Sequence, residues 1–313
     1  MNELDDKWER EAITKLAESS LREQKRARNW SIFFKFLTFA YLVTLLVVFT
    51  ESDISTTNIT TKHTALINLT GMIAESEKAS ADNIVTALRN AFDNKKTAGV
   101  ILRINSPGGT PVQAGYIYDE IVRLRAKHPD TPLYAVITDM CASGGYYVAA
   151  AADKIFADKA SIVGSIGVRM DNFGFVEAMK KLGIERRTLT AGENKALLDP
   201  FSPVNKDVNK HMQTMLTGIH QQFIDAIKKG RGERLKQDVK GLFSGLIWTG
   251  EQSLEIGLVD ELASSSHVAR EVIGVEYVVD YTLTEDLLER LTKRVGAAMA
   301  STLIQQNNTP NLQ

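Results

Sequence analysis

The chain has 313 residues, of which 44% are hydrophobic and 24% are charged. These are ordinary values for a globular protein, and the length is sufficient for a buried core, so global disorder is excluded. The formal net charge of -1 gives no electrostatic reason to expect nucleic-acid binding, and the lone cysteine, Cys141, excludes an intrachain disulfide and a cysteine-cluster metal site.

The N-terminal part of the chain predicts a membrane anchor. Residues 1–29 are strongly charged, with apolar side chains at helical spacing, which predicts an amphipathic helix on the cytoplasmic side. Residues 30–50 are almost wholly apolar, over the length of about 20 residues that crosses a hydrocarbon core. The run lacks a small-x-small cleavage site, which favours a retained transmembrane anchor over a signal peptide. A buried core helix is the alternative. Basic residues before the span and Glu51 and Asp53 after it predict that the rest of the chain lies outside.

Residues 51–63 are polar and rich in threonine and serine, which is typical of a linker. Beyond it, Ser80 is a candidate helix cap and Pro111 opens a further helix. Strands separated by such helices predict right-handed β-α-β units, and therefore an α/β fold with a mostly parallel sheet. The runs that predict strands are 65–69, 99–104, 133–138, 154–157, 162–168 and 185–189.

From residue 204 the pattern becomes helical. Residues 204–229 carry a long apolar stripe, which predicts contact with the core or with another subunit. Short α/β segments follow, with a strand at 276–280. We expect the main domain to comprise residues 64–285 and to be followed by a C-terminal helix and a frayed tail at 286–313.

The sequence V-I-T-D-M-C-A-S-G-G-Y-Y at 136–147 is the first candidate for chemistry. It predicts a strand, a tight turn and a buried helix, with Ser143 at the tip of the turn. The first N–H groups of the helix would lie beside that hydroxyl, which suits a nucleophile next to a developing oxyanion. The same string also fits a plain strand-to-helix connection in which the glycines have no catalytic role.

Three other segments contain glycine beside polar residues. I-N-S-P-G-G-T at 104–110 follows a buried-looking strand and could direct N–H groups at a ligand, or be a simple Pro-Gly turn. It lacks the Gly-Lys-Ser/Thr ending of a phosphate loop. G-S-I-G at 164–167 contains Ser165. The loop at 190–200 contains Lys195, which on its own fits a solvated surface charge.

A Ser-His-Asp triad does not fit this sequence. Cys141 occupies the first position of the G-x-S-x-G motif, where glycine is needed. No histidine follows the serine in a glycine-framed loop, so a different base is required. The five histidines lie in the linker, before a proline, on the long helix or in the tail: His63, His128, His211, His220 and His267.

Several motifs in the same order resemble the signal peptide peptidase A family, the protease IV type of serine peptidase. They are I-N-S-P-G-G at 104–109, C-A-S-G-G-Y-Y-V-A-A-A-A-D-K-I-F-A at 141–157 and G-S-I-G-V at 164–168, and the resemblance covers about residues 64–265. It implies a β-α-β superhelix related to Clp protease and crotonase, preceded by a single transmembrane helix.

The resemblance also implies a role for each site residue. Ser143 matches the nucleophile, Lys195 the general base of a Ser/Lys dyad, and Ser165 the hydroxyl that orients the lysine. The N–H groups of Gly109 and Gly144 match the oxyanion hole. The implied activity is hydrolysis of released signal peptides and other hydrophobic segments through an acyl-enzyme, at the outer face of the cytoplasmic membrane, with neither a metal nor a cofactor.

A lysine accepts a proton only when it is neutral, and burial away from carboxylates favours the neutral form. The dyad therefore requires the carboxylates of Glu193 and Asp199 to point away from Lys195. Cys141, where the family often has alanine, is expected to be a small packing residue.

The chain carries one copy of the fold, as do the half-length members of this family. Such members form homo-oligomeric rings in which the dyad is shared, so we expect Ser143 and Lys195 to come from neighbouring protomers. Two alternatives remain. A crotonase-like acyl-thioester enzyme would bind coenzyme A and give Ser143 and Lys195 no joint function, and a membrane scaffold with the same fold would have no catalytic function.

Overall fold

The computed structural model describes residues 3–51 and 60–283. By its internal contacts the chain divides into two units, one of residues 1–59 with 285–313 and one of residues 60–284. The predicted C-terminal helix and tail at 286–313 lie outside the described residues, as does most of the predicted linker at 51–63.

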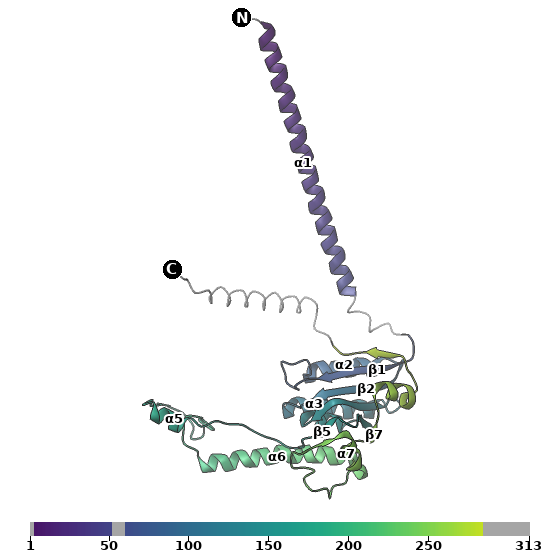
Figure 1. The fold of residues 1–313 in the computed structure, drawn as a ribbon, viewed down its shortest axis with the longest axis vertical. Helices are drawn as coiled ribbons and strands as arrows, with labels where there is room; N and C mark the ends of the chain where they lie inside the picture. The colour runs from purple at the N-terminus through teal and green to yellow at the C-terminus, as the bar shows by residue number, and fades with distance from the viewer. Residues whose placement is uncertain (1–2, 52–59, 284–313) are drawn as a thin grey trace. The chain divides into compact units, whose positions relative to one another are not determined.

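The first unit contains helix α1 (Glu3–Glu51), which is continuous (Figure 1). The predicted amphipathic helix and the predicted anchor are therefore parts of one helix. Residues 14–46 are long and apolar enough to cross a membrane, a test that a signal sequence would also pass. None of this span is buried in the structure, whereas a core helix would be mostly buried.

The second unit is built on a mostly parallel sheet of eight strands, which confirms the predicted α/β class. Its main path has the order β6-β5-β3-β2-β1-β8, and β4 and β7 lie off this path. All pairs are parallel except β5 with β6. The strands are β1 (His63–Thr70), β2 (Thr97–Ser106), β3 (Leu133–Ala142), β4 (Lys154–Ala157), β5 (Ile162–Gly164), β6 (Ile247–Thr249), β7 (Glu261–Leu262) and β8 (Val278–Asp280).

Strand β3 divides the sheet. Its first half pairs with β4, whereas its last three residues, Met140 to Ala142, pair with β5. The carboxyl ends of β3 and β5 are therefore neighbours, and both end where the predicted serine motifs begin. The predicted strand at 162–168 is shortened to three residues because Ser165 adopts a left-handed backbone conformation, with φ of 50°.

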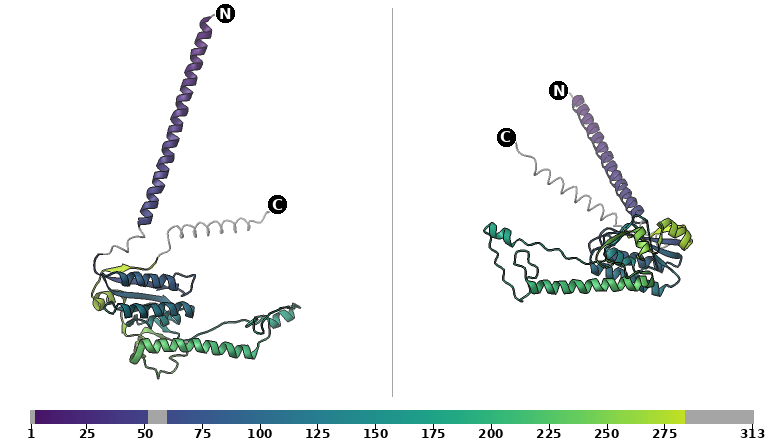
Figure 2. Two further views of the ribbon diagram at one scale, coloured as in Figure 1. Left: turned by 180° about the vertical axis from the view of Figure 1, so that it is seen from behind. Right: turned by 60° about the horizontal axis from the view of Figure 1, so that its bottom comes forward.

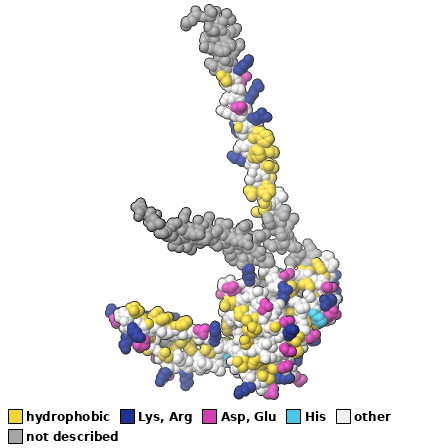
Figure 3. All heavy atoms as spheres, in the orientation of Figure 1, with side chains coloured by type: hydrophobic (Ala, Val, Ile, Leu, Met, Phe, Trp, Pro, Cys, Tyr) yellow, Lys and Arg dark blue, Asp and Glu magenta, His cyan; other side chains and the backbone are white. Residues whose placement is uncertain are grey.

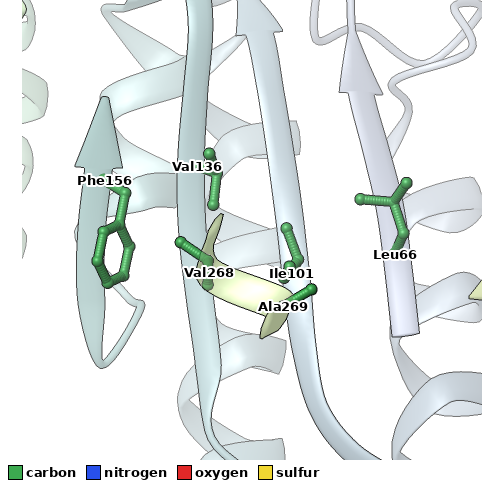
Figure 4. Packing of buried hydrophobic residues seen from close by; sticks show 6 residues of the cluster. All are labelled: Leu66, Ile101, Val136, Phe156, Val268 and Ala269. Atoms are coloured by element: carbon green, nitrogen blue, oxygen red, sulfur yellow. The ribbon is translucent and has the colours of Figure 1, made fainter. Parts of the chain in front are cut away.

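The sheet is buried on both faces. Helices α2 (Ala81–Asp93) and α3 (Pro111–Lys127) begin as predicted, α2 with Ser80 as its cap and α3 with Pro111 in its first turn. On the face that Figure 4 presents, the short π-helix η2 (Val268–Ile273) packs its Val268 and Ala269 against side chains from four strands. Alternate residues of each strand point to opposite faces, so both faces bury apolar side chains. The strand side chains labelled in Figure 4 are Leu66, Ile101, Val136 and Phe156.

Residues 169–216, which we call the arm, extend from the sheet. They contain α5 (Val176–Lys181) and the first part of α6 (Lys206–Arg231), which project from the rest of this unit (Figures 1 and 2). None of the residues of the arm is buried. Hydrophobic side chains gather at its outer end (Figure 3). The predicted strand at 185–189 is wrong, because this segment lies in the arm without a neighbouring strand to pair with.

The other end of α6 is anchored in the body of the second unit. Arg231 is 1% exposed, and its Nη1 lies 2.7 Å from Oδ2 of Asp260. The same carboxylate accepts the N–H of Ile155 in β4. This buried ion pair fixes the C-terminal end of α6 against the sheet. The remaining short elements are α4 (Gly144–Ala149), η1 (Gly232–Arg234), α7 (Gly250–Glu255) and α8 (Ser265–His267).

Candidate active site

Ser143 lies at the tip of the predicted strand-turn-helix, between β3 and α4. Its φ of 52° is in the left-handed region, which is uncommon for a residue with a side chain and often marks a functional turn. Its N–H donates to the carbonyl oxygen of Gly164 at 2.8 Å, which holds the turn in place. The hydroxyl makes no capping bond to α4, so it is available for other chemistry.

The turn at Ser143 packs directly against the glycine loop at 104–110. An ideal Cβ added to Gly108 would lie 2.7 Å from the nitrogen of Gly144, and one added to Gly109 would lie 2.0 Å from the carbonyl oxygen of Ile73. Both glycines are therefore required by the close approach of two backbones. Ile73 clamps the loop, since its N–H donates to Gly108 at 2.9 Å and its carbonyl accepts the N–H of Thr110 at 2.8 Å.

This contact brings two backbone donors together. An ideal Cβ on Gly144 would be 3.2 Å from the nitrogen of Gly109. Within residues 60–283, no protein acceptor is recorded for the N–H of either glycine. Two such donors next to a serine hydroxyl form the arrangement that can stabilise an oxyanion.

Ser165 directly follows the neighbouring strand β5. The register pairs Ala142 with Gly164, so the next residues, Ser143 and Ser165, leave the sheet side by side. Ser165 also has a positive φ, and its N–H donates to Leu246 at 2.7 Å. The two serines are thus held by separate backbone hydrogen bonds.

Ser143, Ser165, Gly109 and Gly144 all line one pocket of about 670 Å³. Arg169 is the one charged side chain among the described residues of this lining. Most of the other side chains of the wall are apolar or aromatic: Met72, Pro107, Pro111, Ala114, Tyr147, Val168, Ile219 and Phe223.

The aromatic part of the wall joins α6 to the nucleophile turn. The ring centroid of Tyr147, in α4, lies 5.1 Å from that of Phe223 and 5.2 Å from that of Tyr118. Burial raises the pKa of Tyr147 and of Tyr118, so both hydroxyls stay neutral. The pocket wall is therefore uncharged on this side.

Lys195 is the one predicted site residue that the single chain does not bring to this pocket. It lies exposed in the arm, in the loop between α5 and α6. No ion pair joins it to Glu193 or Asp199 among the described residues, and Asp199 pairs instead with Arg186 at 2.7 Å.

No histidine among the described residues lines the pocket. Nε2 of His220, on α6, lies 3.2 Å from the carbonyl oxygen of Ile166, and His63 is buried against the hydroxyl of Tyr281. Neither lines the pocket. No group of three metal-ligating side chains occurs within the described residues. Cys141 is fully buried, and burial raises the pKa of its thiol, as expected for a packing residue.

Comparison with known proteins identifies the family. The profile of Peptidase family S49 matches residues 125–274, a range that includes Ser143, Ser165 and Lys195. A putative protease of Methanocaldococcus jannaschii is 32% identical over 219 residues, which cover 68% of this chain and 69% of that protein. The chain belongs to peptidase family S49. A putative signal peptide peptidase SppA of Enterococcus faecium is 30% identical over 227 residues, which cover 70% of this chain and 65% of that protein.

A further relative of this S49 chain is much longer. A protein of Brucella melitensis described as a Na(+)/H(+) antiporter NhaA is 44% identical over 187 residues, which cover 60% of this chain. The match covers only 25% of that protein, so the chain spans a quarter of its length.

Some site residues were not predicted from the sequence. Ile219 and Phe223 belong to the apolar stripe of the long helix, whose pattern indicated core or subunit contact but not a pocket wall. Arg169 had no distinguishing signal beyond its place after the G-S-I-G motif. Gly108 was visible as the first glycine of I-N-S-P-G-G, and its φ of 98° explains why that position needs glycine.

Proposed function

We propose that this S49 chain is a membrane-anchored serine endopeptidase with Ser143 as nucleophile and Lys195 as general base. The observation that carries the proposal is that Ser143, Ser165 and the free N–H groups of Gly109 and Gly144 line one pocket. A nucleophile, a second hydroxyl and two oxyanion donors are the parts that acyl transfer needs beside a base.

The proposed reaction has two steps. Neutral Lys195 takes the Ser143 proton, and the serine oxygen attacks the scissile carbonyl carbon. The N–H groups of Gly109 and Gly144 stabilise the oxyanion, the C–N bond breaks, and the lysine ammonium returns its proton to the leaving amine. Water, deprotonated by the same lysine, then attacks the acyl-enzyme, the bond to the Ser143 oxygen breaks to release the second peptide, and the lysine ammonium returns its proton to Ser143. Ser165 orients the lysine.

We infer that the lysine comes from a second protomer, in a homo-oligomeric ring. Lys195 lies on an exposed arm and does not line the Ser143 pocket of its own chain. The arm exposes large hydrophobic side chains, with Phe173 at 74% and Leu182 at 73%, which is a common property of subunit interfaces.

The proposed substrates are released signal peptides and other hydrophobic segments, near the outer face of the cytoplasmic membrane. The apolar wall of the pocket supports an apolar peptide, and helix α1 supports a retained anchor. Mass measurement of the protein from membranes tests the anchor: the full chain is expected, whereas a product that begins after residue 50 would identify α1 as a cleaved signal sequence.

A serine-reactive acylating probe tests the dyad. We expect labelling of Ser143 that is lost in Ser143→Ala and strongly reduced in Lys195→Ala. The matched controls are Ser76→Ala and Lys78→Ala, which change an exposed serine and an exposed lysine outside the pocket. Absence of labelling in folded wild-type protein, or full labelling in Lys195→Ala, would contradict the proposal. Coenzyme A binding without peptide hydrolysis would favour the acyl-thioester alternative.

Mixing two inactive variants tests the shared dyad. Rings that contain both Ser143→Ala and Lys195→Ala protomers should regain part of the peptidase activity, because some sites then combine an intact serine with an intact lysine. Exchange of protomers is checked with a mass tag on one variant. Confirmed mixing without any regained activity would contradict a dyad formed between protomers.

A further inference from the structure

The loop that carries Lys195 is closed by one carboxylate. Asp199 accepts the hydroxyl of Ser202 at 2.7 Å and the N–H of Phe201 at 3.3 Å, and its Oδ1 lies 2.7 Å from Nη1 of Arg186. The Asp199 side chain is only 6% exposed, although it lies in an arm without a buried residue. The hydrogen bond from Ser202 lowers the pKa of this carboxyl, so Asp199 is ionised at neutral pH.

Arg186 is held in position independently of Asp199. Its guanidinium carbon lies 5.0 Å from the ring centroid of Phe201, a cation-π contact, and its Nε donates to Thr188 at 2.9 Å. The Phe201 ring stacks on Phe175 at 5.5 Å. The arginine is therefore set over the end of the Lys195 loop by an aromatic support.

This arrangement matters because of where Asp199 stands in the chain. It follows Lys195 by four residues, and a lone carboxylate that close would favour the charged ammonium, which cannot act as a base. Pairing with Arg186 offsets the negative charge and holds the carboxylate at the closed end of the loop. Glu193, the other acidic residue of the loop, is exposed.

We propose that Arg186 is a positioning residue that keeps Lys195 usable as a base by sequestering the Asp199 carboxylate. The proposal rests on the Ser/Lys dyad proposed above. Asn172 supports the same geometry, since its Nδ2 donates to the carbonyl oxygen of Leu198 at 2.9 Å next to the paired aspartate.

None of the other ion pairs near the Lys195 loop among the described residues involves Asp199. Arg187 pairs with Glu185 at 2.8 Å, and Arg169 lies 3.6 Å from Asp171. Arg169 also lines the Ser143 pocket, so it would face the lysine in an assembled dyad. The remaining charged or titratable residues of the arm are Glu177, Lys180, Lys181, Glu193, Lys206, Asp207, Lys210 and His211.

The pH dependence of kcat/KM for an apolar peptide substrate, measured on the full-length assembled protein, tests the proposal. In Arg186→Gln the rising limb should move to higher pH by about half a unit, as expected for one exposed charge. This corresponds to about a threefold loss of activity on that limb, which should recover at high pH and shrink in about 1 M salt. In Asp199→Asn, and in the double variant Arg186→Gln/Asp199→Asn, kcat/KM should begin to rise at the same pH as in the wild type or at a lower pH.

Arg187→Gln is the matched control. It removes one positive charge next to Arg186 in the sequence, but from a different ion pair, the exposed pair with Glu185. Its profile should match that of the wild type. An equal loss of activity at every pH in Arg186→Gln would show a purely structural role, and an equal shift in Arg187→Gln would show an effect of net charge. Either result overturns the proposal. Failure of the dyad itself is distinguishable, because Lys195→Ala would then keep wild-type activity.

Discussion

The contact between Gly144 and Gly109 predicts that replacing Gly144 with alanine lowers peptidase activity strongly while the free energy of unfolding changes little. In Gly144→Ala the new Cβ would lie 3.2 Å from the Gly109 nitrogen and 3.3 Å from Cβ of Ala114. Both distances are a few tenths of an ångström shorter than ordinary contacts, so the two loops must move apart. The N–H groups of Gly109 and Gly144 would then no longer converge on the same oxygen.

The expected magnitudes decide which effect dominates. Loss of one oxyanion donor costs about 10² to 10³ in kcat. The effect on stability should be small, because alanine is favoured over glycine in a helix by about 1 kcal/mol, which offsets a contact strain of similar size. We therefore expect kcat to fall at least about 10²-fold while the free energy of unfolding changes by less than about 1 kcal/mol.

The assay compares peptide hydrolysis with thermal unfolding of the same preparation. Gly115→Ala is the matched control, since nothing lies within 4 Å of the position of its Cβ. This variant should keep wild-type kcat and gain up to about 1 kcal/mol of stability from helix propensity in α3. Gly144→Ala with wild-type kcat would refute the role of these two N–H groups.

Two further predictions concern buried charges. Arg231→Ala removes the buried partner of Asp260 and leaves that carboxylate only the more exposed Arg234, at 3.1 Å. It should cost about 3 kcal/mol in denaturant unfolding, whereas Arg270→Ala, in an exposed pair, should cost less than about 1 kcal/mol. Hydrogen bonds from Arg123, together with those from Arg89, lower the pKa of Glu120 to about 2, so its stabilisation is present above pH 4.5 and is lost as the pH falls toward 2. On the order of 2 kcal/mol of stability should be lost over that range and be absent in Glu120→Gln; an unchanged acid dependence in that variant would contradict the assignment.

The nucleophile turn could be predicted because its residue types leave few choices. An apolar run that ends in Ser-Gly-Gly and resumes with a helix former specifies strand, turn and helix locally, and the structure places Ser143 at that turn. The same local reasoning failed at 185–189, where the residues suit a strand but the segment pairs with no strand among the described residues. A strand forms only where a second strand accepts and donates its backbone hydrogen bonds, and the residues of one segment do not show whether such a partner is present.

The pocket wall and the general base also depend on contacts between segments that are far apart in the sequence, which a local sequence pattern does not specify. Phe223 lies in an apolar stripe that fits the core, a subunit contact or a pocket equally well, and only the packing of α6 beside Tyr147 distinguishes these. The resemblance to a family selected Lys195, but its spacing from Ser143 does not determine whether the two meet within one chain.

The two halves of the proposed site differ in how the chain holds them. Ser143 and Ser165 both have left-handed backbones, which cost on the order of 1 to 3 kcal/mol each, and each is held by a backbone hydrogen bond to a neighbouring segment. Such strain persists only where the surrounding packing over-determines the geometry, and these turns lie at the ends of the buried strands. Lys195 instead lies in an arm without buried residues, where hydrogen bonds and one ion pair shape the loop. A rigid serine half and an exposed lysine half fit the proposed dyad shared between protomers, in which folding would set the nucleophile and assembly would supply the base.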